Sequence, residues 1–305
     1  MGSGSIGVAF AIVFARAGYQ VGCWDVSSGA RDRASSDLDG KLSQLHLHGL
    51  LDEDPSVVRN RVTFHPDLED AVASAELVQE CAPEDLQLKR DLFSQLSDLT
   101  APESVLASSS SAIVPSALAD GLSCADRIVV GHPGNPPYLL PVIEVVPSPA
   151  SASSTVEHAL GVYASAGLRP VLVKKEVEGF IFNRLQGALL REAYCLLRDG
   201  VSNVADIDAV VRLGLGRRWG VVGPFETVDL NTRGGIEAHA ATMGPAYERM
   251  GAERGQHDPW TADLVALAAA QRRALVPSDD WDDRVAWRDE RLMRMAAAFR
   301  DGVAS

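Results

Sequence analysis

The sequence contains little cysteine and no long apolar run, and both scarcities narrow the class of protein. Its four cysteines (Cys23, Cys81, Cys124 and Cys195) are scattered over 305 residues without a CxxC pair. This distribution predicts reduced thiols in a cytoplasmic protein and no metal site. Because no segment approaches the ~18 consecutive apolar residues of a membrane span, and the first residues carry no basic stretch, we expect neither a transmembrane helix nor a signal peptide.

Positive charge is also scarce. Lys and Arg together number 28 against 41 Asp and Glu, which gives a formal net charge of −13. A chain this acidic gains nothing from counterion release on a phosphate backbone and is repelled by anionic lipids. We therefore expect no nucleic acid and no membrane as partner. The remaining composition, 46% hydrophobic and 23% charged residues, is typical of a globular protein, and the length predicts two domains.

Short strand patterns alternate with helical patterns in the first half of the chain. The expected strands are Tyr19–Asp25, Arg61–His65, Glu76–Cys81, Ser104–Ser108, Ile128–His132, Val142–Val146 and Pro170–Lys174. A helix is expected to start at Gly7, and others at Leu86–Leu96 and Thr155–Ala166. This alternation predicts an α/β fold with a doubly wound, mostly parallel sheet covered by helices on both faces.

Only helical patterns follow beyond about Glu176. They cover Phe180–Arg198, Ala205–Leu213 and the tail from Trp260 to Val303, with a polar break at Pro277–Asp280. The change of pattern predicts a first domain of residues 1–175 and an all-helical C-terminal domain of residues 176–305. The apolar face of Phe180–Leu197 exceeds what one small domain needs, which favours a homodimer interface; a helix buried within the domain is the alternative.

Three glycines at the start of the chain have the spacing of a dinucleotide-binding loop. Gly2, Gly4 and Gly7 form a G-x-G-x-x-G pattern that lets the backbone turn beside a pyrophosphate at a helix N-terminus. Asp25 follows Gly4 by 21 residues, at the end of the next expected strand, where a carboxylate bonds the ribose hydroxyls and repels a 2′-phosphate. The pattern therefore favours NAD over NADP. The alternative is a flexible loop and a surface Asp.

A dinucleotide-binding fold also needs a β-strand directly before the first glycine, and only Met1 precedes Gly2. Burial of a five-residue apolar strand contributes ~7–15 kcal/mol, comparable to the net stability of a whole domain. We therefore expect that the first strand is missing from this sequence and that the natural chain starts upstream. Mass spectrometry of the native protein tests this expectation, and Met1 or Gly2 at the N-terminus would contradict it.

Polar residues gather where two further strands are expected to end. The run Ser108–Ser111 follows one strand, at the sheet edge where α/β proteins bind ligands. His132 ends the next strand, and Glu144 lies twelve residues later, beyond a proline-rich turn. The chain can fold back there to bring the carboxylate onto the imidazole, which makes the histidine a general base. A packed core histidine is the alternative interpretation.

Two motifs around these residues resemble those of a known family. Gly131–Tyr138 (GHPGNPPY) and Pro141–Pro147 (PVIEVVP) are similar to the signature of the 3-hydroxyacyl-CoA dehydrogenase superfamily, closest to its λ-crystallin/L-gulonate 3-dehydrogenase branch. Supporting stretches are Gln79–Glu84, Gly179–Gln186, Gly223–Thr227 and Trp287–Glu290. The resemblance covers essentially the whole chain. It implies a Rossmann-type NAD-binding domain followed by a helical substrate and dimerisation domain.

The resemblance also implies residue roles. His132 matches the catalytic base and Glu144 the acid that orients it, while Ser111 and Asn183 match the polar pair that holds the substrate oxygen. Dinucleotide contacts are implied for Ser5, Ile6, Asp25, Glu84, Lys89 and Asn135. Gly134 stands where relatives carry a larger apolar residue, so we expect a looser pocket wall beside the base.

The implied reaction is NAD-dependent oxidation of a 3-hydroxy acid. His132 takes the proton of the 3-hydroxyl while a hydride leaves the same carbon for the nicotinamide. Segment Val26–Pro66 holds five cationic residues against six carboxylates, a poor platform for the phosphates of coenzyme A. A small acid such as L-gulonate is therefore favoured. A 3-hydroxyacyl-CoA, a carnitine-like acid and a non-enzymatic, crystallin-like NAD-binding role remain open.

Two further motifs are less specific. Arg217 and Arg218 follow a glycine-containing turn, and Arg218 is a candidate ligand of a substrate carboxylate; an ordinary surface pair is the alternative. His46 and His48 have a metal-like spacing on an expected strand, but no acidic or cysteine partner lies at ligand spacing. We therefore expect a solvated surface there.

Overall fold

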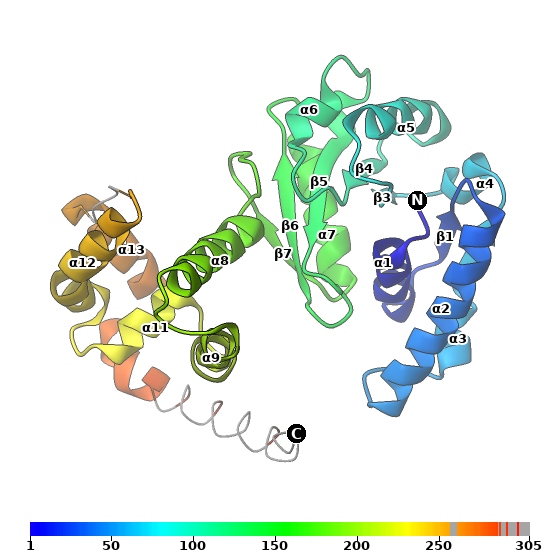
Figure 1. Cartoon of the computed structure of the whole chain (residues 1–305). Helices are drawn as coiled ribbons and strands as arrows, with labels where there is room; N and C mark the ends of the chain where they lie inside the picture. The colour runs from blue at the N-terminus through cyan, green and yellow to red at the C-terminus, as the bar shows by residue number, and fades with distance from the viewer. Residues whose placement is uncertain (257–260, 286, 288–290, 292–297, 299–305) are drawn as a thin grey trace. The chain divides into compact units, whose positions relative to one another are not determined.

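The computed structural model describes residues 1–256, 261–285, 287, 291 and 298. The chain divides into two compact units, Met1–Arg191 and Glu192–Ser305. The first unit combines strands and helices, and the described part of the second unit consists of helices joined by turns (Figure 1). The architecture confirms the expected fold class. The boundary expected between residues 175 and 176 stays a prediction.

Seven short strands lie in the first unit, every residue of which the structure describes. They are β1 (Val21–Trp24), β2 (Val62–His65), β3 (Leu77–Glu80), β4 (Val105–Ser108), β5 (Ile128–Pro133), β6 (Val142–Pro147) and β7 (Arg169–Leu172). Strands β1 and β2 form a parallel pair, and the other five form a sheet in the order β3-β4-β5-β6-β7. Within that sheet β5 and β6 are antiparallel and the other neighbours are parallel.

The first two residues of the chain lie between β1 and β3. The terminal nitrogen of Met1 donates to the carbonyl oxygen of Gln79, and the Met1 oxygen accepts from Cys81, both at 2.8 Å. Gly2 donates to the carbonyl oxygen of Trp24 at 2.8 Å. Met1 and Gly2 thus occupy the line of a strand between the two sheets. The expected upstream start of the natural chain stays a prediction.

Helices cover both faces of the five-stranded sheet. The helices of the first unit are α1 (Ser5–Arg16), α2 (Ser28–Leu47), α3 (Pro55–Arg59), α4 (Leu68–Val72), α5 (Leu86–Leu99), α6 (Pro115–Ala119), η1 (Ala125–Arg127), α7 (Ser153–Ser165) and the first part of α8 (Phe182–Arg198). Helices α1 and α7 share one apolar cluster with β4, β5 and β6, while α5 and α6 share another with β3, β4 and β5. Helix α1 begins at Ser5, two residues before its expected start at Gly7.

The expected strand at His46 and His48 is wrong. His46 lies in the last turn of α2, and His48 is the residue that ends it. Ser27 caps the start of this helix, and Leu38, Leu42 and Leu45 recur on its buried face, a helical period that overrides the short alternating pattern. Residues two apart on a helix do not face each other, which removes the geometric basis for a shared metal ligand.

The described part of the second unit consists of helices with a few buried apolar residues, among them Leu230, Ile236 and Ala269. Its described elements are α9 (Val204–Val210), η2 (Val211–Leu215), α10 (Gly216–Trp219), α11 (Pro224–Asn231), α12 (Gly235–Glu253), α13 (Ala262–Leu275) and η3 (Ser278–Asp280). The buried Asp229 accepts from the Ile236 amide and from Arg273, which ties α11 to α12 and α13. Part of the expected tail helix and residues 288–290 of the last supporting motif lie outside the described residues.

In the described part of the chain, none of the helices has the length and apolar content to cross a membrane.

Candidate functional site

The glycine loop leaves room for a ligand and allows close backbone contacts. Gly2 has a φ of +84°, and a Cβ there would lie 2.7 Å from the Cys81 oxygen. A Cβ on Gly7 would lie 1.9 Å from the Gly2 oxygen, so both positions require glycine. Gly4 faces open space and caps α1, whose first turn carries no acidic side chain. A helix start of this kind, with unpaired amide groups, binds a pyrophosphate well.

Asp25 directly follows β1 and is held by the loop that precedes α1. Its Oδ2 accepts from the amide of Ser3 at 2.9 Å and from the Ser3 hydroxyl at 3.0 Å, and its Oδ1 accepts from the Ser27 amide at 3.0 Å. Partial burial alone would raise the pKa of this carboxyl, but these hydrogen bonds and the charge of Arg31 hold the pKa below its ordinary value. The residues therefore fit NAD, whose ribose hydroxyls need an ionised acceptor.

His132 and Glu144 form a buried pair on neighbouring strands of the five-stranded sheet. They lie directly opposite each other in the antiparallel register of β5 and β6. The Nδ1 atom of His132 lies 2.7 Å from Oε2 of Glu144, and both side chains are buried. The rings of Phe180 and Phe182 lie 5.6 and 6.1 Å from the imidazole. The fold thus brings together the two residues that the sequence placed twelve apart.

The other oxygen of Glu144 is bonded to the start of α8. Its Oε1 accepts from the Ile181 amide at 2.7 Å and from the Phe182 amide at 3.0 Å. A carboxylate that accepts backbone amides at a helix N-terminus is fixed in both position and rotamer. The tight turn before it holds Phe180 at a φ of +49°, an uncommon conformation that its complete burial maintains. Neither amide was anticipated from the sequence.

Asn183 connects α8 to the serine run after β4. Its Nδ2 donates to the backbone oxygen of Ser111 at 3.1 Å. The two residues that the resemblance paired are thus in contact, although the bond reaches the backbone of Ser111. Both side chains are at least partly accessible. An amide nitrogen carries two hydrogens, so one donor of Asn183 remains for a ligand.

Glu84 organises the serine run from the other side. Its Oε1 accepts from the Ser110 hydroxyl at 2.5 Å, from the Ser111 amide at 3.0 Å and from the Ala112 amide at 3.1 Å. Partial burial opposes ionisation, but these bonds and the nearby charge of Lys89 lower the pKa of Glu84 below its ordinary value. Glu84 therefore fixes the loop that carries Ser111.

Lys89 is almost completely buried, and its ammonium group is held by the protein itself. Its Nζ lies 2.8 and 2.9 Å from the two oxygens of Glu80 and 3.1 Å from the Ala82 oxygen. The Ser108 hydroxyl donates to the same Glu80 carboxylate at 2.6 Å. Oε2 of Glu84 lies 3.6 Å from the Nζ atom of Lys89. The dinucleotide contact implied for Lys89 stays a prediction.

Sequence reasoning missed Glu80, Ser108 and Ser110 as parts of this network. The serine run marked the region, but the partner of each hydroxyl depends on how α5 and the β3 end pack. The nine-residue separation of Glu80 and Lys89 crosses a strand end and a helix start, and no periodicity predicts it. A lysine on the apolar face of the Leu86–Leu96 helix was the available signal, because buried lysines require a paired carboxylate.

The remaining candidate site residues, Asn135 and Arg218, lie in different parts of the chain. Asn135 is exposed, directly after the buried Gly134. A Cβ on Gly134 would lie 3.0 Å from Val142 Cγ1 and 3.2 Å from Leu140 Cβ. The expected loosening of the pocket wall is therefore wrong, because neighbouring side chains fill that space. Arg218 lies in α10 of the second unit, and its contact with substrate stays a prediction.

The sequence is similar to those of known proteins over almost its whole length. Residues 1–177 match the family model of the 3-hydroxyacyl-CoA dehydrogenase NAD-binding domain, and residues 179–275 match that of its C-terminal domain. A lambda-crystallin homolog of Homo sapiens is 35% identical over 97% of this chain and 94% of its own. An L-carnitine dehydrogenase of Pseudomonas sp is 37% identical over 86% of this chain and 78% of its own.

Solved structures give the same result. A 3-hydroxybutyryl-CoA dehydrogenase from Escherichia coli K12 matches with a TM-score of 0.65 at 32% sequence identity. The match covers 75% of this chain and 48% of that one, so the chain spans about half the length of this solved relative. These similarities confirm the resemblance carried by the motifs around His132 and Glu144.

Proposed function

Because the chain belongs to the 3-hydroxyacyl-CoA dehydrogenase family, we propose that it oxidises the 3-hydroxyl of a small, L-gulonate-like 3-hydroxy acid to the 3-keto acid. Family membership makes it an NAD-dependent oxidoreductase that acts on a CH–OH group. The observation that carries the proposed chemistry is the buried pair of His132 and Glu144 at the start of the helix that bears Asn183.

His132 serves as the general base. With Glu144 at its Nδ1, we assign the ring proton to Nδ1, which leaves the lone pair of Nε2 to accept the hydroxyl proton of the substrate. The carboxylate stabilises the imidazolium that forms, while its bonds to the Ile181 and Phe182 amides prevent it from turning away. The glycine loop and Asp25 would hold NAD, which would supply the hydride acceptor for the same carbon.

Asn183 and Ser111 hold the substrate oxygen. Negative charge grows on that oxygen as the proton leaves, and donors fixed in advance stabilise it. The free N–H of Asn183 and the Ser111 hydroxyl are the two donors that we assign. Glu84 holds the Ser111 amide, and Asn183 holds the Ser111 oxygen, so this residue is fixed on both sides.

The charges around α2 favour a small acid over a thioester of coenzyme A. Lys41 forms an ion pair with Asp37. Nε of Arg59 lies 2.8 Å from Oδ1 of Asp39. Nη1 of Arg61 lies 2.6 Å from Oε1 of Glu53. A further cation, Arg31, donates to the Asp25 backbone oxygen. Three of the five cationic side chains of this segment are thus ion-paired and a fourth is hydrogen-bonded within the protein, which makes the segment a poor site for the phosphates of coenzyme A.

Initial rates of NADH formation test the proposal. We would measure them with saturating NAD and with L-gulonate, L-carnitine and 3-hydroxybutyryl-CoA in parallel. Turnover of gulonate at the highest kcat/KM supports the proposal. A preference for the thioester would overturn the charge argument, and a preference for carnitine would indicate a cationic-tail substrate instead. NADH binding without turnover of any hydroxy acid would favour the crystallin-like, non-enzymatic role.

We also propose a homodimer and a cytoplasmic location. Helix α8 bears Leu185, Leu190, Tyr194 and Leu197, all exposed, which supports an apolar contact with a second copy. The four cysteines are free, as they would be in a reducing compartment. Light scattering of wild type against Leu190→Glu tests the dimer, and an unchanged monomeric mass for both would contradict it.

A further inference from the structure

Two buried hydrogen bonds in series end at the residue directly before His132. The hydroxyl of Tyr163, on α7, donates to Oε1 of Gln79, on β3, at 2.5 Å. Nε2 of Gln79 donates in turn to the backbone oxygen of Gly131, on β5, at 3.3 Å. We call these three residues the Tyr163 network. Both of its side chains are buried, and the proposed chemistry uses neither of them.

The Tyr163 network and the imidazole of His132 lie on opposite faces of the five-stranded sheet. Gln79 lies beside Ala107 in the register of β3 and β4, and Ala107 belongs with Tyr163 to the apolar cluster that includes α1 and α7. Successive side chains of a strand point to opposite faces. His132 points to the other face, where its ring packs against Phe180 of the second cluster. The network therefore contacts β5 from the side away from the imidazole.

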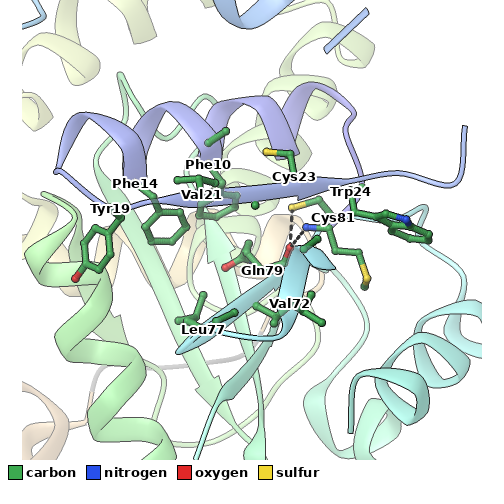
Figure 2. Close-up of a pocket in the computed structure, with 18 of the residues that line it drawn as sticks. Phe10, Phe14, Tyr19, Val21, Cys23, Trp24, Val72, Leu77, Gln79 and Cys81 are labelled. Atoms are coloured by element: carbon green, nitrogen blue, oxygen red, sulfur yellow. Dashed lines mark hydrogen bonds between the residues drawn. The ribbon is translucent and has the colours of Figure 1, made fainter. Parts of the chain in front are cut away.

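Apolar surroundings keep the two side chains of the network bonded to each other. Gln79 lines a cavity of about 350 Å³ between β1 and β3, together with Phe10 and Phe14 of α1 (Figure 2). The ring of Phe14 also stacks on that of Tyr163, with 6.4 Å between their centroids. An unpaired amide or hydroxyl in such a place loses its hydration without compensation. Burial raises the pKa of the Tyr163 hydroxyl above its ordinary value of 10.0, so the hydroxyl stays protonated and remains a donor.

Gly131 allows the phenol to approach the backbone of β5. A Cβ at this position would lie 2.2 Å from Oη and 2.9 Å from Cζ of Tyr163, and 3.3 Å from Oε1 of Gln79. Any other residue would displace the phenol. A glycine inside a strand is typical of a place where another group comes close to the backbone. The residue before His132 is therefore glycine because the network occupies the space of its side chain.

The Gly131 oxygen depends on Gln79 because β4 ends too early to bond it. The register of β4 and β5 ends at Ser108. The amide of Ser110, which would come next in the ladder, donates to the Ser108 hydroxyl at 3.2 Å instead. The Gln79 amide thus replaces a ladder bond. Because the peptide unit is planar, a bond to the Gly131 oxygen also fixes the plane that carries the His132 amide.

We infer, on the basis of the proposed function, that Gln79 and Tyr163 are positioning residues, which fix the peptide plane before His132 and thereby orient the imidazole between Glu144 and the substrate hydroxyl. Neither side chain touches the substrate in this account. Without the network, β6 and the contact with Glu144 still hold the residue, but the plane before it is free to turn. A reacting group misplaced by about 1 Å loses rate by ~10²-fold, so a partial misplacement should cost ~10-fold.

Steady-state kinetics of three variants test the inference. Gln79→Met keeps the length of the side chain and removes both bonds, and it should lower kcat per NADH-binding site by ~10-fold with KM within about 2-fold. Tyr163→Phe removes one oxygen and leaves the bond to Gly131, so its loss should be smaller, ~3-fold. Ser104→Ala is the matched control, because it removes an equally buried bond, to the Ala75 oxygen at 2.7 Å, at the far end of β4. Its kcat should be that of the wild type.

Proton NMR of the free protein gives a second readout that needs no turnover. The proton between Nδ1 of His132 and Glu144 should give a low-field resonance, assigned by its loss in His132→Ala. Gln79→Met should move this resonance upfield, because the bond lengthens when the imidazole turns, and Ser104→Ala should leave it in place. A shift confined to Gln79→Met supports the inference even if the wild type oxidises no hydroxy acid, an outcome that refutes the proposed function alone.

Two outcomes would overturn the positioning role. In the first, the resonance of Gln79→Met stays at its wild-type position. In the second, Gln79→Met and Ser104→Ala lower kcat and move the resonance equally, which would show that any buried bond of the sheet has this effect. If Gln79→Met does not fold, Tyr163→Phe decides between the same outcomes, since it changes a single atom.

Discussion

The two halves of the proposed active site differ in how completely their backbone is bonded. Around His132, β5 and β6 pair over five register positions, and Glu144 is bonded both to the imidazole and to the start of α8. Around the glycine loop, β1 and β3 belong to separate sheets that are linked through Met1 and Gly2. The comparison teaches that the positions of His132 and Glu144 depend on one antiparallel strand pair. The glycine loop, on the proposed cofactor side, depends instead on backbone bonds that join two sheets.

The largest expected effect is a loss of kcat without a loss of NADH affinity, which would distinguish the His132 half of the proposed site from the glycine-loop half. His132→Ala removes the proposed base, and we expect kcat to fall by ~10³-fold, because positioned proton transfer contributes this order of rate. NADH affinity should stay within about 2-fold, since the ring lies outside the glycine loop. Steady-state kinetics and NADH fluorescence titration measure the two quantities. His158→Ala, a partly exposed histidine of α7, is the control, and a parallel loss of NADH affinity would contradict the separation.

The second prediction concerns the buried charges between the two halves. Lys89→Met leaves the Glu80 carboxylate buried without its partner, and we expect a loss of ~3 kcal/mol in the free energy of unfolding. The double variant Glu80→Gln, Lys89→Met should recover most of it. Urea denaturation gives the values. Lys41→Met breaks a partly exposed pair and should cost under about 1 kcal/mol; equal losses for both lysine variants would refute the argument.

Glu144→Gln should lower kcat by ~10- to 100-fold while the protein stays folded. Glutamine keeps an oxygen for the Ile181 and Phe182 amides but does not stabilise the imidazolium. Circular dichroism and initial rates measure folding and activity. Glu176→Gln, at another carboxylate that accepts a backbone amide, should leave kcat unchanged. A kcat for Glu144→Gln equal to that of the wild type would mean that His132 needs no carboxylate.

The smallest effect is a pH dependence. The pKa of Asp25 lies below its ordinary value of 3.8, so this carboxylate stabilises the fold above that value, and the contribution is lost as the pH falls through the lower, folded value. We expect Asp25→Asn to reduce the loss of unfolding free energy as the pH falls below about 4. The same substitution should also weaken NADH binding by a few-fold and reduce the preference of the protein for NADH over NADPH. Identical pH profiles for both proteins would exclude this contribution.

Local patterns predicted much of this structure. Apart from the strand expected at His46 and His48, each expected strand from Tyr19 to Lys174 corresponds to a strand in the structure, with ends that shift by at most two residues, because alternation and flanking turns are properties of the chain itself. The twelve-residue spacing with its proline-rich turn indicated that the chain can fold back to bring Glu144 onto His132, and the structure has this contact. The short strand at His46 was wrong, since the buried leucines of α2 impose a longer helical period.

The sequence by itself thus determined the strand order along the chain, the acidic residue after β1 and the possible contact of His132 with Glu144, since each depends on residues close together or on one fold-back. Tertiary structure alone decided that Lys89 is bonded to Glu80, that α8 amides hold Glu144, and that a groove separates β1 from β3. These features arise where distant elements pack, and the free energy of packing depends on shape and burial that no local pattern encodes.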